Sequence, residues 1–171
     1  LLGDDHPDTL QSVNNMGNLL YVQGKHAEAE PYFREALERR LRVLGDEHPN
    51  TLNSINSMGT LLQKLGRLSE AEAYTREALE KRRRLLGDNH PDTLISLNNM
   101  GVLLDKLGKL AEPEPYYREA MEGGRRLSGD DDLNSLNTMM SLSSLLEARG
   151  EHAEAVELMA LPPHVSAPII R

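Results

Sequence analysis

The sequence predicts an all-α fold, an α-solenoid built from stacked helix-turn-helix repeats. Three observations lead to this prediction. The 171-residue chain aligns with itself without a gap at a period of 42 residues. Each period holds two stretches whose apolar residues recur at helical spacing. Aromatic residues make up 4% of the chain, with no Trp and one Phe, which suits helical cores of Leu, Ala and Met better than β-sheets.

The period divides the chain into four units, 2–43, 44–85, 86–127 and 128–161, followed by a Pro-rich tail at 162–171. We expect residues 1–161 to form a single array in which each repeat contacts its neighbours. Leu1 aligns with Val43, the last residue of a unit, so we also expect a fragment that begins at the end of a preceding repeat. Arrays without polar end repeats expose apolar surface, which predicts end-to-end self-association.

The first helix of each of the first three units is expected to begin at a His-Pro pair, which the fourth unit lacks. The decapeptide at 1–10 recurs with small changes at 43–52 and 85–94, each time with His before Pro. Proline suits the first turn of a helix, where its missing N–H is not needed. Equivalent atoms in stacked repeats lie about 10 Å apart, whereas zinc ligands lie about 2 Å from one metal. We therefore interpret His6, His48 and His90 as helix-start residues and predict no metal site.

In the first unit, Gly24 is expected to lie in the turn that follows the first helix, and Gly45 to end the second helix, which runs from about residue 26 to 43. The inward faces of the two helices are predicted from their apolar spacing: Leu10, Val13, Met16, Gly17 and Leu20, then Ala29, Tyr32, Phe33, Ala36, Leu37 and Leu41. In the third unit Pro113 replaces Ala29, and the pair Gly123-Gly124 replaces two arginines. Each Gly costs about 1 kcal/mol of helix propensity relative to Ala, so we expect this helix to fray early.

The run from Val13 to Ala36, with Gly17, Ala29 and Ala36 at positions for small residues, resembles the tetratricopeptide repeat. The 42-residue length and the His-Pro connector are similar to the longer repeats of kinesin light chains. The resemblance implies a right-handed α-solenoid of stacked helix-turn-helix (tetratricopeptide-like) repeats. It also implies that the first helix of each repeat lines a concave groove that holds extended peptides, often through asparagines.

Polar residues on one face of each first helix predict a peptide-binding groove. A carboxamide both donates and accepts, so a ladder of amides can pair with the backbone of an extended peptide of any sequence. The predicted groove residues are Gln11, Asn14, Asn15, Asn18, Tyr21, Asn53, Asn56, Thr60, Gln63, Lys64, Asn98, Asn99, Val102, Asp105 and Lys106. In the fourth unit the same face carries Asn137. An alternative stays open for Asn14, Asn56 and Asn98, which could instead bond a neighbouring helix and fix the repeat spacing.

Charge restricts the partners that the sequence favours. A net charge of -8 argues against nucleic acid, whose phosphates need a basic surface. The charged residues of the predicted groove are two basic ones, Lys64 and Lys106, and two acidic ones, Asp105 and Glu147. An acidic motif or a C-terminal carboxylate needs several converging cations, which disfavours the acidic cargo peptides of kinesin light chains. The basic runs at 38–42 and 80–84 fall in the last turns of second helices, where cations complement the helix dipole.

Motifs for catalysis, metals or membranes are missing from the sequence. It contains no Gly-rich phosphate loop, HExxH or GxSxG. The segment 129–135 starts like a calcium loop, but Ser135 replaces the required Gly. No apolar run approaches the roughly 18 residues of a transmembrane helix, and the absence of Cys fits a reducing compartment. We predict no enzyme activity, no cofactor, no metal and no membrane contact, and a cytoplasmic location.

Together these features predict a protein–protein interaction scaffold that binds an extended peptide or partner segment in the groove lined by the first helix of each repeat. The alternative is a regulatory or oligomerisation segment of a larger signalling protein, linked to a kinase or NTPase, with intramolecular contacts. The sequence leaves the partner's identity open.

Overall fold

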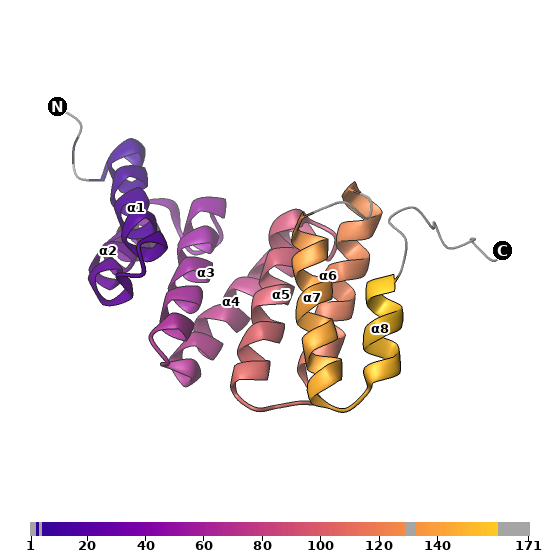
Figure 1. Cartoon of the computed structure of the whole chain (residues 1–171). Helices are drawn as coiled ribbons and strands as arrows, with labels where there is room; N and C mark the ends of the chain where they lie inside the picture. Colours follow the sequence, from indigo (N-terminus) through magenta and orange to yellow (C-terminus); the bar gives the residue numbers. More distant parts are fainter. Residues whose placement is uncertain (1–2, 4, 129–132, 161–171) are drawn as a thin grey trace. The chain divides into compact units, whose positions relative to one another are not determined.

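The computed structural model describes residues 3, 5–128 and 133–160, which contain eight α-helices and no strand (Figure 1). This confirms the predicted all-α class. The chain forms two compact units, Leu1–Leu85 and Leu86–Arg171, and each contains two helix-turn-helix pairs. The acidic part of the rejected calcium loop, Asp130–Asp132, and the predicted tail at 162–171 lie outside the described residues.

The first unit holds α1 (Pro7–Val22), α2 (His26–Leu44), α3 (Pro49–Lys64) and α4 (Leu68–Leu86). Helix α2 packs against both α1 and α3. Small residues let the paired helices approach closely. A Cβ atom added at Gly17 would lie 3.0 Å from the Phe33 ring, and one added at Gly59 would lie 2.6 Å from the Thr75 hydroxyl. In both pairs of this unit, a Gly is therefore required where the first helix crosses the second.

Each His-Pro pair begins a helix, as predicted. Helices α1, α3 and α5 (Pro91–Lys106) all start at the Pro, and the preceding His is the N-cap residue. The Nδ1 atom of each His accepts a hydrogen bond from the backbone N–H two residues later, at 3.2 Å for His6, 3.1 Å for His48 and 3.2 Å for His90. An acceptor at the N-cap satisfies one of the unpaired N–H groups of the first turn. These histidines therefore serve the fold.

The second unit holds α5, α6 (Pro113–Ser128), α7 (Leu133–Ala148) and α8 (His152–Ala160). Its core gathers apolar side chains from α6, α7 and α8, namely Tyr117, Met121, Leu142, Leu145, Leu146, Ala155 and Leu158. Pro113 occupies the first position of α6, where a proline is tolerated, so this helix begins later in its repeat than α2 or α4.

Helix α6 continues through Gly123 and Gly124 to Ser128, although the low helix propensity of glycine led us to expect fraying there. The reason is packing against α5. A Cβ atom at Gly123 would lie 2.4 Å from Cδ2 of Leu94, so Gly lets the two helices approach where a larger residue would clash. Tertiary contact outweighs the low helix propensity of glycine here.

Two side chains predicted to point inward are exposed. Met16 of α1 is 44% exposed, whereas its counterpart one repeat later, Met58 of α3, is fully buried. The difference follows from position, because α3 packs against α2, whereas no helix precedes α1 in the described chain. Leu41 of α2 is also exposed, at 40%.

Within the described residues, no helix combines the length and apolar character needed to cross a membrane. No three His, Asp or Glu side chains in that part of the chain come together so that they could hold a metal ion.

Candidate functional site

Helix α1 carries several exposed amides. Asn15 and Asn18 are exposed, and the side chain of Gln11 donates a hydrogen bond to Oδ1 of Asn15 at 2.8 Å. Tyr21, further along α1, is partly buried. Its ring lies 5.1 Å from that of His26 and 6.4 Å, edge to face, from that of Phe33. Burial raises the pKa of the Tyr21 hydroxyl, so this group stays protonated and can donate a hydrogen bond.

Arg40 ties α1, α2 and α3 together from a buried position, with 3% of its surface exposed. Its Nη1 donates to the hydroxyl of Ser54 at 2.8 Å and to the carbonyl of Asn50 at 3.1 Å. It also lies 3.4 Å from Oδ1 of Asn14, while Nη2 donates to Oε1 of Gln11 at 3.0 Å. Asn14 thus bonds a neighbouring helix, as in the alternative in which this residue fixes the repeat spacing.

The partners of Arg40 are neutral oxygen atoms. Burial lowers the pKa of the guanidinium group because the charged form loses its hydration, although arginine stays charged. The same contact recurs one repeat later, where Nη2 of Arg82 donates to Oδ1 of Asn53 at 2.6 Å. These buried arginines lie within the basic runs that the sequence suggested were complements to the helix dipole. Their position in the packing between helices was not anticipated.

The remaining predicted residues of α3 differ in exposure. Lys64 is exposed, Asn56 and Thr60 are partly exposed, and Gln63 is buried. The Thr60 hydroxyl donates to the carbonyl of Asn56 at 2.9 Å, a bond within the helix. Lys64 is therefore the most accessible of these four side chains.

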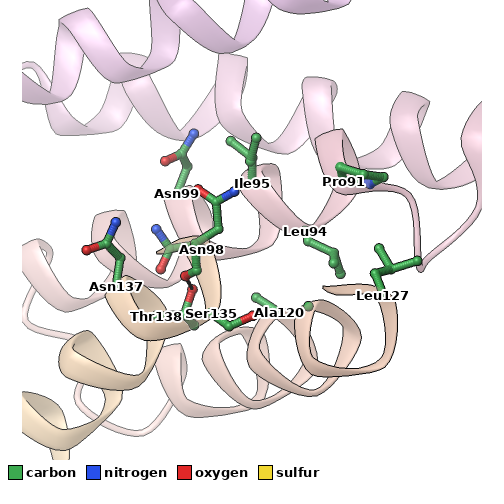
Figure 2. A pocket seen from close by; sticks show the side chains of 12 residues that line it. Pro91, Leu94, Ile95, Asn98, Asn99, Ala120, Leu127, Ser135, Asn137 and Thr138 are labelled. Carbon is green, nitrogen blue, oxygen red and sulfur yellow. Dashed lines mark hydrogen bonds between the residues drawn. The ribbon is translucent and has the colours of Figure 1, made fainter. Parts of the chain in front are cut away.

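The second unit contains a pocket of about 230 Å³ at the junction of α5, α6 and α7. Figure 2 shows that Asn98 and Asn99 of α5 approach it from one side and Asn137 and Thr138 of α7 from another. Apolar side chains line the other end of the same pocket. The full lining is Pro91, Leu94, Ile95, Asn98, Asn99, Ala120, Gly124, Leu127, Asn134, Ser135, Asn137 and Thr138.

The pocket contains an unusual polar atom. Oδ1 of Asn98 is buried and has no hydrogen-bond partner. Buried polar groups are usually paired, and leaving one unpaired costs about 1–3 kcal/mol. The neighbouring Thr138 hydroxyl donates to the carbonyl of Asn134 at 2.8 Å, and the hydroxyl oxygen can still accept a bond. Asn98 thus has unused acceptor capacity beside the pocket that it lines.

Three predicted residues of α5 do not line this pocket. Val102 is partly buried and packs against the core of the second unit. Asp105 is partly exposed and Lys106 is exposed. Burial raises the pKa of the Tyr117 hydroxyl, and the negative charge of Asp105 raises it further. The structure therefore brings together Asn98, Asn99 and Asn137 of the predicted faces and adds Asn134 and Thr138 from α7.

Paired helices that repeat every 42 residues, with polar side chains along the first helix of each pair, define a helical-repeat protein. The tetratricopeptide repeat model matches residues 8–83 and 52–122, and the chain belongs to this family. No curated protein matches the sequence.

Solved structures share the fold at low identity. One is a kinesin-light-chain-type protein of Podospora anserina with nearly identical TPR-like repeats, at 21% identity and a TM-score of 0.74, covering 92% of this chain and 75% of that chain. Another is BtubC (BKLC) of P. vanneervenii, at 21% identity and a TM-score of 0.78, covering 97% and 72%. The Rap protein complexed with Competence and Sporulation Factor gives 16% identity and a TM-score of 0.80, covering 92% and 42%. These matches confirm the predicted tetratricopeptide solenoid fold.

Proposed function

We propose that this protein is an interaction scaffold that binds an extended peptide or partner segment along the first helices of its repeats. Fold alone does not define function, so the proposal depends on the site. The observation that carries it is the pocket of the second unit, where amides from α5 and α7 converge beside an apolar end. Amides can bond a peptide backbone, and the apolar end can accept a side chain.

The first unit supports the same use. Asn15 and Asn18 are exposed on α1, and Lys64 is exposed on α3. Gln11, Asn14 and Asn53, in contrast, hydrogen-bond buried arginines. We therefore assign peptide contact first to Asn15, Asn18, Asn99 and Asn137, and a mainly scaffolding role to the amides that arginine holds. One similar structure, the Rap protein, was solved with a bound factor, which is compatible with this use of the fold.

A random peptide library displayed on phage tests the proposal. Peptides selected on the wild-type chain should lose at least about tenfold in affinity when Asn15, Asn18 and Asn99 are changed together to Ala, because each amide removed loses about 1 kcal/mol of hydrogen bonding. In the matched control, Glu38, Glu80 and Glu122 are changed together to Ala. These residues are exposed at equivalent positions on the second helices. Binding unaffected by the amide variant, or equally reduced by the control, would contradict the proposed groove.

Self-association is a second candidate, because α1 exposes Met16, Leu19 and Val22, the last two at 53% and 83%. Exposed apolar patches favour association with a complementary surface. Light scattering should show a mass that rises with concentration, and changing Met16 and Leu19 to Glu should abolish the rise. A constant monomer mass would remove this candidate. The regulatory alternative, linked to a kinase or NTPase, stays a prediction, as do the cytoplasmic location and the absence of enzyme activity.

A further inference from the structure

The pocket of the second unit occupies the place that an arginine side chain fills in the first. Residues 40, 82 and 124 are equivalent in the 42-residue period, and they are Arg, Arg and Gly. Gly124 lines the pocket. The four residues that Arg40 contacts, Gln11, Asn14, Asn50 and Ser54, correspond to Ile95, Asn98, Asn134 and Thr138. All four of these counterparts also line the pocket.

Most of the hydrogen-bonding groups that hold Arg40 are therefore retained around Gly124. Asn98 matches Asn14 in identity, and its Oδ1 is the buried atom without a partner. The carbonyl of Asn134 corresponds to the carbonyl of Asn50, and the hydroxyl of Thr138 corresponds to that of Ser54. The one acceptor lost is the Gln11 amide, which Ile95 replaces. Three of the four groups that accept hydrogen bonds from Arg40 therefore have counterparts around Gly124.

The size of the pocket agrees with this origin. Its volume of about 230 Å³ far exceeds the roughly 10–15 Å³ that one water molecule needs. Its apolar end, with Leu94 and Leu127, suits the methylene stem of a long side chain, while Asn98 provides an acceptor for the polar head (Figure 2). No residue that lines this pocket carries a charge, as is also true of the neutral acceptors around Arg40.

We propose that this pocket binds the guanidinium group of an arginine side chain supplied by the partner segment. This inference rests on the proposed function and adds the chemistry of the bound residue. A guanidinium carries five donors in a planar fork and no acceptor, which complements the unpaired Oδ1 of Asn98 and the hydroxyl oxygen of Thr138. Lysine offers a compact charge that fits the arrangement less well. The same chain shows that these neutral oxygens hold a guanidinium away from water, since Arg40 is 3% exposed.

NMR titration of the 171-residue chain with N-acetyl-arginine methylamide tests the proposal directly. Saturable shifts are expected at the side-chain amide of Asn98 and at the backbone amides of Asn134 and Thr138. The citrulline analogue has nearly the same shape without the charge and should bind at least about tenfold more weakly, as expected for the loss of a charged hydrogen-bond donor. Equal binding of the citrulline analogue, or no saturable shift at Asn98, would overturn the proposal.

Three variants locate the effect. Gly124→Arg should fill the pocket with its own guanidinium and abolish the shifts, and Asn98→Leu should weaken them while keeping a cavity. Arg40→Gly provides the reverse test, because it creates the same vacancy in the first unit. Ligand-induced shifts should then appear at Asn14 and Ser54, which the wild-type protein does not show. Failure of Arg40→Gly to bind, with a spectrum that shows it folded, would also overturn the proposal.

The test separates this inference from the proposed function. Peptides selected from the library that bind along α5 and α7 without any loss on replacing Arg by citrulline would support the groove and overturn the arginine pocket. Binding of the arginine probe in the pocket, with no peptide selected, would support the pocket and contradict the groove.

Discussion

Arg40 of α2 and Gly124 of α6 are equivalent residues two repeats apart, and the side chain present at the first is missing at the second. Arg40 bonds Ser54 on the first helix of the following repeat at 2.8 Å, whereas Gly124 leaves a pocket beside the corresponding Thr138. One packing arrangement therefore serves two purposes in this chain. It links adjacent repeats in the first unit and forms the candidate binding pocket in the second.

Replacing Gly124 with Arg should stabilise the protein. The change removes a helical Gly, worth about 1 kcal/mol, and supplies donors to the unpaired Oδ1 of Asn98. We expect the midpoint of thermal unfolding, followed by circular dichroism, to rise by about 2–4 °C per kcal/mol gained. Gly124→Ala is the control. It gains helix propensity alone, so its unfolding midpoint should rise less. A midpoint for the Arg variant at or below that of the Ala variant would contradict the equivalence of the two sites.

Truncating Arg40 to Ala should destabilise the first unit by about 2–3 kcal/mol. The buried acceptors of Asn14 and Ser54 would lose their donor, and buried groups left unpaired carry the full cost of desolvation. Urea unfolding measures the change. Arg42→Ala is the matched control, because its ion pair with Asp5 is exposed and such pairs contribute about 0–1 kcal/mol. Similar losses for both variants would show that Arg40 does not link the repeats.

Adding a methyl group at Gly101 should disturb the core of the second unit. The new Cβ would lie 2.6 Å from the ring of Tyr117, which is 1% exposed and has little room to move. We expect Gly101→Ala to cost about 1–3 kcal/mol, the usual range for overpacking. Gly17→Ala should cost less, because the nearest ring atom of Phe33 is 3.0 Å away. The reverse order in urea unfolding would contradict the described contacts.

Acid should destabilise both units through two equivalent glutamates. Hydrogen bonds from Arg34 and Arg67 lower the pKa of Glu30, and Arg118 lowers that of Glu114, with Arg149 adding to the effect. A carboxyl whose pKa is lowered by folding stabilises the protein above its ordinary pKa, near 4.5, and loses this contribution as the pH falls through the lower folded-state value.

The thermal midpoint should therefore decrease as the pH is lowered from about 5 to about 3. In a Glu30→Gln, Glu114→Gln double variant, the midpoint should decrease less steeply over the same pH range. Changing the exposed Glu38 and Glu80 to Gln controls for overall charge. Identical pH profiles for the wild type and the Glu30, Glu114 variant would show that these ion pairs do not contribute to acid sensitivity.

Repetition explains why the fold could be predicted from the sequence. The first three repeats carry the same start signal, and each His Nδ1 at the N-cap bonds its helix in the same way, so the pattern His-Pro marked three helix starts correctly. The same periodicity could not predict which apolar side chains are exposed on α1, the first helix. Met16 and Met58 occupy identical positions, and only the contacts of their helices with neighbouring helices make one exposed and the other buried.

The candidate site was predicted less completely, because helical periodicity identifies a face and not the partner across it. The spacing of Asn98 and Asn99 placed them on the exposed face of α5, and both line the pocket. Arg40 was assigned to a basic run because its contacts with Asn14 and Ser54 join residues 26 and 14 positions apart. One feature of the sequence could have indicated a cavity: the position that is Arg40 in the first repeat is Gly124 in the third.

A crystal structure of the chain with a library-selected peptide would show directly where the peptide lies. We expect a peptide extended across α5 and α7, with backbone hydrogen bonds to Asn99 and Asn137 and an arginine side chain beside Asn98 in the pocket at Gly124. A peptide bound on the surface of α6 or α8, with that pocket unfilled, would contradict this expectation.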